Sequence, residues 1–148
     1  MGFIILSMFL IVIAFFVFIY VFTAKWHNKL LEYMEYENAW FAWIPILSNY
    51  ALADMVCSWV EEETVKLGNN SISKSFIRLY PIIALVVNFI PGIGQLASLI
   101  VYLLLGGYVY QQVFAVMEEC DPEQCKGIGM ISGWINIIGA TKFKKYFS

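Results

Sequence analysis

Long apolar stretches alternate with short polar loops along the chain, and the first stretch is the most regular. Residues 2–22 contain Ser7 as their one polar side chain and carry no charge. As an α-helix rising 1.5 Å per residue, they would cover about 31 Å, the thickness of a bilayer's hydrocarbon core. The run is longer than the apolar part of a signal peptide, and no basic residue precedes it. The pattern therefore predicts an uncleaved membrane span.

A second apolar block covers residues 76–117. As a single helix it would be about 63 Å long, roughly twice the thickness of a bilayer. Pro91-Gly92 interrupts the block and favours a turn. The block thus predicts a hairpin of two further spans, at about residues 76–91 and 94–117.

Two other apolar stretches, at about residues 39–60 and 127–141, have defects that argue against crossing. The first contains Pro45 near its start and Asp54 inside it. The second would reach only about 22 Å as a helix, and it is rich in glycine. We expect both to be short re-entrant or interfacial helical segments, which are tolerated where protein or water covers their backbone.

The positions of the nine basic residues support this threading. If all five apolar stretches crossed, the basic residues would divide five against four. If the two defective stretches do not cross, all nine lie on one side, as the positive-inside rule favours. We therefore expect three full spans, the N-terminus outside and the C-terminus in the cytoplasm. A plain four- or five-span bundle remains the alternative.

Composition agrees with lipid as the surrounding medium. The 148 residues are 61% apolar and 14% charged, whereas soluble domains are about 45–50% apolar and about 25% charged. We expect an all-α protein with one membrane domain over residues 1–148. The lipid bilayer is its expected partner, and a net charge of −2 gives no reason to expect nucleic acid.

Polar side chains inside apolar stretches are the candidates for function. Asp54 would cost about 2.5–3.5 kcal/mol at bilayer depth, and intramembrane carboxylates often mark ion or proton pathways. Four amides could join it in a polar interior: Asn49, Asn88, Gln95 and Asn136. Alternatively, Asp54 lies near the membrane surface, shortly before Glu61.

Aromatic residues predict where the helices are anchored at the membrane interface, and small residues predict where helices pack closely. The tryptophans are the expected interface anchors, since indole rings collect at headgroup level: Trp26, Trp40, Trp43 and Trp59. His27 lies among basic residues after the first span, where a headgroup contact is the simplest role. The glycines of the later stretches would let a partner helix approach closely: Gly106, Gly107 and Gly133.

The three cysteines do not predict a disulfide framework. Cys57 lies in an apolar stretch and most simply packs as a small hydrophobic residue. Cys120 and Cys125 flank a polar loop and could form a disulfide, or bind a metal with further ligands, although their spacing is not a strong metal signature. We expect no cofactor and no catalytic site, because the one histidine has no evident nucleophile beside it.

Residues 38–46 read NAWFAWIPI, and this segment carries a resemblance. It is similar to a group of small uncharacterised bacterial integral membrane proteins, mostly Gram-positive, that have an NAW-x-AWIPI-type segment after a first span. The resemblance covers roughly residues 25–117 and implies a bacterial inner-membrane address but no activity. The acidic run at residues 61–63 and the loop at 120–125 depart from the pattern.

The functional expectation is a small non-enzymatic membrane protein that acts by association. Three spans bury little surface against one another, so we expect a homo-oligomer or an accessory subunit that binds other membrane subunits. A first alternative is an oligomeric pore or small-ion transporter with Asp54 in the path. A second is a toxin-immunity or phage-related membrane protein.

Overall fold

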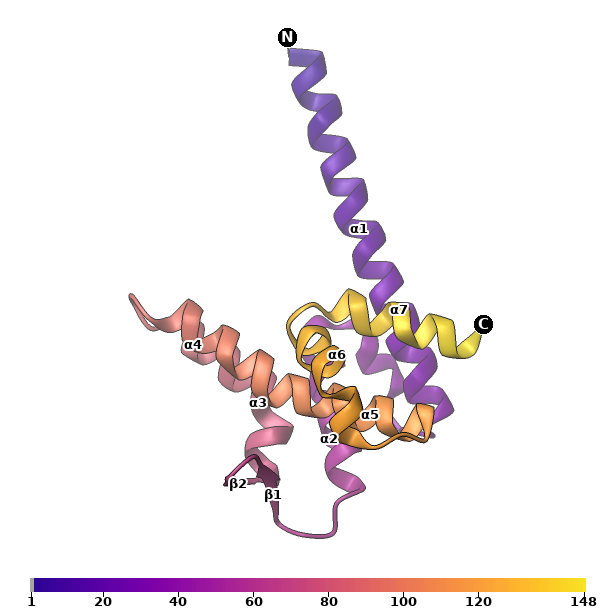
Figure 1. The fold of residues 1–148 in the computed structure, drawn as a ribbon. Coiled ribbons are helices and arrows are strands. Elements are labelled where there is room, and N and C mark those ends of the chain that lie inside the picture. Colours follow the sequence, from indigo (N-terminus) through magenta and orange to yellow (C-terminus); the bar gives the residue numbers. More distant parts are fainter. Residues whose placement is uncertain (1) are drawn as a thin grey trace.

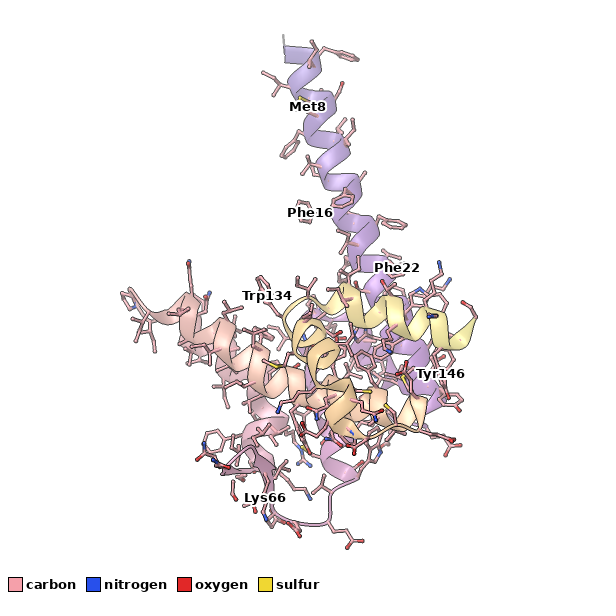
Figure 2. The ribbon with its side chains drawn as sticks, in the orientation of Figure 1. Met8, Phe16, Phe22, Lys66, Trp134 and Tyr146 are labelled. Atoms are coloured by element: carbon pink, nitrogen blue, oxygen red, sulfur yellow. The ribbon has the colours of Figure 1, made fainter. Side chains whose placement is uncertain are left out.

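A computed structural model describes residues 2–148, and its most prominent feature is the helix α1, Gly2–Tyr33, which extends away from the rest of the molecule (Figure 1). The most apolar 18-residue window of α1 has no buried residue. Burial begins at Ala24, and from there the helix packs into the body of the protein. Met8 and Phe16 accordingly stand free of any neighbouring element (Figure 2). The first helix therefore has an apolar rod and a packed base.

The remaining elements form a helical body at the base of α1. In chain order they are the 3-10 helix η1 (Ala39–Trp43), α2 (Pro45–Ser58), strands β1 (Thr64–Leu67) and β2 (Asn70–Ser73), α3 (Lys74–Asn88), α4 (Gly94–Val101), the π-helical turn η2 (Tyr102–Gly106), α5 (Gly107–Glu118), α6 (Pro122–Trp134) and α7 (Asn136–Phe147). The strands pair antiparallel, with Thr64 opposite Ser73. The Gly68-Asn69 turn joins them, and Gly68 has a φ of +62°.

Aromatic and aliphatic side chains from five helices make the core of the body. The largest fully buried side chains come from α1, α2, α3, α5 and α7: Leu30, Leu31, Leu52, Ile77, Tyr80, Tyr110, Phe114 and Phe143. In α2, eight of fourteen residues are buried. The apolar surface of residues 45–58 is therefore used largely within the body.

Glycines bring α5 and α6 into close contact. A Cβ atom at Gly133 would lie 2.6 Å from the carbonyl carbon of Gly106 and would also meet the backbone nitrogen of Gly107. A Cβ atom at Gly129 would lie 2.8 Å from the Gly107 carbonyl oxygen. The predicted close approach thus occurs within one chain, and the partner helix of Gly106 and Gly107 is α6.

The helices α3 and α4 form an apolar hairpin that projects from the body (Figure 1). Ser73 caps α3, its hydroxyl accepting from the backbone N–H of Ser75. At the tip, Gly92 has a φ of +87°, which favours glycine, and Phe89 is 77% exposed. Exposed apolar side chains continue down both limbs: Phe76, Ile82, Val86, Ile93, Leu96, Ile100 and Leu104.

The all-α prediction is confirmed apart from the short β-hairpin formed by β1 and β2. The prediction of three full spans is not supported. By length and composition, two helices in the described chain could cross a membrane, Gly2–Tyr33 and the continuous Gly94–Glu118. The expected span at 76–91 forms α3, whose 15 residues reach only about 22 Å. A four- or five-span bundle has no support for the same reason.

One buried hydroxyl in this core gives a stability prediction. Tyr80 is fully buried, and its hydroxyl has no hydrogen-bond partner among residues 2–148. An unpaired buried polar group costs about 1–3 kcal/mol. We expect Tyr80→Phe to keep or raise the thermal unfolding temperature in detergent, whereas Tyr110→Phe, which removes a paired hydroxyl, should lower it. A clear loss of stability in Tyr80→Phe would contradict this assignment.

Candidate functional site

The base of α1 is held by a buried polar contact that crosses three helices. His27 is fully buried, its Nε2 lies 2.5 Å from the Tyr110 hydroxyl, and its Nδ1 lies 2.8 Å from the Thr23 carbonyl oxygen. The Phe143 ring of α7 stacks edge-on against the imidazole, with ring centroids 5.2 Å apart. The expected headgroup contact of His27 is therefore wrong. This side chain joins α1 to α5 and α7.

Burial changes the acid–base behaviour of His27. The residue lies beyond the apolar stretch 2–22, within the body. Desolvation outweighs the opposing hydrogen bond to the Thr23 carbonyl and lowers the pKa of His27 from 6.5 to about 4. The imidazole is therefore neutral at physiological pH and adds no charge to the base of α1.

Lysines surround the same end of the body. Helix α7 packs across the base of α1 (Figure 1), and both helices carry lysines: Lys25 and Lys29 on α1, and Lys142, Lys144 and Lys145 on α7. Lys144 Nζ lies 5.8 Å from the ring centroid of Phe22, the last residue of the apolar stretch. Lysines beside aromatic rings at the end of an apolar helix are typical of the headgroup layer.

The predicted tryptophan anchors differ in their surroundings. Trp43 lies beside α1, because its carbonyl oxygen accepts a hydrogen bond from the Tyr20 hydroxyl. Trp40 is 56% exposed, and Trp26 is half-buried between Lys25 and Lys29. Trp59 lies instead in a pocket with Glu35 and Asp54, at the far end of α2. Trp134, which was not predicted as an anchor, lies near the same end of the body as Phe22 (Figure 2).

Three of the five predicted polar residues meet in one pocket of about 450 Å³. The Asn136 side-chain amide of α7 donates to the Oδ1 of Asn49 in α2, at 3.1 Å. Gln95 and the buried Ser98, both from α4, line the same pocket. No charged side chain of the described residues lines it. Amides and a hydroxyl can bind polar groups by hydrogen bonding.

The other two predicted polar residues lie elsewhere. Asn88 is exposed at the hairpin tip, where it lines a second pocket together with Gln95. Asp54 pairs with Arg78 of α3, with 2.8 Å between Oδ1 and Nε, and accepts a hydrogen bond of 2.9 Å from the Tyr36 hydroxyl. Asp54 therefore does not join the amide pocket but forms an ion pair with Arg78.

The Asp54–Arg78 pair gives a modest prediction. Its side chains are 30% and 44% exposed, and such partly solvated pairs contribute about 0.2–1 kcal/mol. We expect Asp54→Asn to lower the free energy of unfolding by no more than about 1 kcal/mol, because asparagine still accepts from Tyr36. A double-mutant cycle with Arg78→Gln measures the coupling. A loss of several kcal/mol would show that Asp54 does more than pair with Arg78.

The loop between α5 and α6 gathers a third group of reactive side chains. Among residues 2–148, no cysteine is in a disulfide, and the Sγ atoms of Cys120 and Cys125 lie 2.7 Å apart. Glu118 lies beside them, with Oε2 4.0 Å from the Cys125 Sγ, and it forms an ion pair with Lys142 of α7. The two cysteines predicted as possible disulfide partners are therefore adjacent, but both carry free thiols. Glu118 and Lys142 were not predicted, because contacts between α5 and α7 leave no local sequence pattern.

The comparisons add no relative. No known protein family, curated protein or solved structure matches this chain.

Proposed function

We propose that this chain is a small non-enzymatic protein of the bacterial cytoplasmic membrane that works by associating with itself or with other membrane subunits. The observation that carries this proposal is the rod formed by residues 2–22 of α1. Its apolar side chains are exposed on all sides, with Phe3 at 82% and Phe16 at 64%. Such a surface requires lipid or the helix of another subunit around it.

The proposed threading has one crossing, by α1. The other candidate span, Gly94–Glu118, is half buried, and its α5 part packs against α6 inside the body. The exposed apolar hairpin of α3 and α4 would then lie in the near leaflet without crossing. All nine basic residues, beginning with Lys25, lie on the body side in this arrangement. The positive-inside rule places that side in the cytoplasm and the N-terminus outside.

One face of the rod suggests where another helix approaches. Ser7 and Ala14 are the smallest side chains in its middle, and they are seven residues apart, which places them on the same face. Phe16 lies about 200° around the helix from Ala14, on the opposite face. Small residues let helix backbones approach in a membrane, so we expect the Ser7–Ala14 face to be the contact.

Native mass measurement from mild detergent and from lipid nanodiscs tests the proposal. We expect a mass above one 17.0 kDa chain. Ala14→Leu should shift the population toward the monomer, because the larger side chain separates the helices. Phe16→Leu is the matched control on the opposite face and should leave the mass unchanged. A strict monomer in both media, with no co-purifying membrane protein, would contradict the proposal.

A further inference from the structure

We propose that Cys120, Cys125 and Glu118 form a binding site for a thiophilic divalent cation of the Zn²⁺ class. One ligand atom from each side chain lies within 4.8 Å of the other two. Zn²⁺ binds cysteine sulfur and carboxylate oxygen, and a zinc site with three protein ligands leaves its fourth tetrahedral position to water. The site lies outside the amide pocket and the Asp54–Arg78 pair.

The local fold determines where the two cysteines lie. Glu119 ends α5 in the left-handed conformation, with a φ of +51°, and so turns the chain back. Asp121 then caps α6, its Oδ1 accepting from the backbone N–H of Glu123 at 3.0 Å. Cys120 lies in this turn and Cys125 in the first turns of α6, so the turn brings both thiols to one point.

The distances need only a small adjustment to hold an ion. Two sulfurs bound to one Zn²⁺ at about 2.3 Å in tetrahedral geometry lie about 3.8 Å apart. The sulfurs of Cys120 and Cys125 are now 2.7 Å apart, so they must separate by about 1 Å. Cys120 lies outside both helices and is only partly buried, so helix geometry does not fix its position. Cys125 is 4% exposed, which leaves the ion partly shielded from water.

Charge favours a cation at this point. Two thiolates and the Glu118 carboxylate carry three negative charges, and Lys142 supplies one positive charge through its ion pair with Glu118. A divalent cation brings the cluster to neutrality. Lys142 also orients the carboxylate, as the residues around metal ligands commonly do.

Binding is a balanced exchange of protons for metal. Zn²⁺ and two thiols give a dithiolate complex and two protons, which pass to the buffer, while no atom changes its oxidation state. On the proposed cytoplasmic side, thiols stay reduced and available for this exchange. That last point rests on the proposed threading, whereas binding by the purified protein does not.

Cobalt binding to the full-length chain tests the site. The protein is purified in mild detergent with a phosphine reductant, freed of metal with a chelator, and titrated with Co²⁺. We expect one Co²⁺ per chain, a thiolate-to-cobalt charge-transfer band, and loss of the band when Zn²⁺ displaces Co²⁺. About two protons per Zn²⁺ should be released into weakly buffered solution.

Matched variants identify the ligands. Cys120→Ser and Cys125→Ser should abolish the charge-transfer band, and Cys57→Ser, at the third cysteine of the chain, should leave it unchanged. Lys142→Gln should weaken Zn²⁺ binding by about 10-fold or more, because the carboxylate loses its orienting partner. Absence of the band and of bound Zn²⁺ in the wild type would overturn the proposal, whether or not any variant folds. Loss of the band in Cys57→Ser would do so as well.

Discussion

Gly133→Ala should unfold or severely loosen the body. The added methyl group would lie 2.6 Å from both the Gly106 carbonyl carbon and the Tyr102 carbonyl oxygen. These are backbone atoms of the continuous helix α4–η2–α5, so they cannot move aside as a flexible side chain would. Overpacking of a core typically costs about 1–3 kcal/mol, and we expect the upper end or more here. The measurement is thermal unfolding in detergent, followed by circular dichroism.

Gly127→Ala supplies the control in the same helix. A Cβ atom at Gly127 would meet nothing within 4 Å. Alanine in an exposed helical position is favoured over glycine by about 0.5–1 kcal/mol, so this variant should unfold at an equal or higher temperature. Similar unfolding temperatures for Gly133→Ala and the wild type would mean that α5 and α6 are farther apart than the structure places them.

Acid should destabilise the junction between α1 and the body. The pKa of His27 is about 4 in the folded protein and 6.5 when the side chain is free. Between these values the unfolded chain binds more protons, so stability is complete above about pH 6.5 and falls as the pH drops toward 4. The difference of about 2.5 pH units corresponds to about 3 kcal/mol once the pH is below 4.

A non-titrating variant isolates this effect from the carboxylates, which also bind protons in acid. His27 is the one histidine in the sequence, and His27→Gln keeps a side chain able to hydrogen bond to Tyr110. The wild type should lose more stability than His27→Gln between pH 7 and pH 4.5, as measured by denaturant unfolding at each pH. Parallel curves for the two proteins would contradict the burial of a neutral imidazole.

Local sequence patterns predicted where the helices and turns form better than they predicted which surfaces the helices contact. The apolar run at residues 2–22 had to form a helix in lipid, and Pro91-Gly92 had to turn the chain. The predicted element at 76–91 begins and ends later than α3 does, and its end was misplaced because the apolar pattern continues through Phe89 and Ile90 after the helix has ended at Asn88. Hydropathy cannot separate an apolar face that meets lipid from one that meets α2 or α6.

The candidate site depends on contacts between residues that are far apart in the sequence, and no local sequence pattern indicates such contacts. Asn49 and Asn136 were selected separately because each is a polar residue in an apolar stretch, and their pairing appears only in three dimensions. Asp54 was grouped with them on the same ground, but Arg78 and Tyr36 bind it in another part of the body. His27 was judged from its basic neighbours along the chain, whereas its real neighbours are Tyr110 and Phe143.

Cysteine labelling in sealed right-side-out vesicles tests the proposed threading most directly. In a background with serine at the three native cysteines, single cysteines are placed at Gly2, at Asn69 in the β-hairpin turn, and at Ile90 in the tip of the α3–α4 hairpin. If α1 alone crosses the membrane, an impermeant maleimide should label position 2 from outside and position 69 only after permeabilisation, and position 90 should stay unlabelled from outside. Labelling of position 90 or position 69 in sealed vesicles would contradict the account.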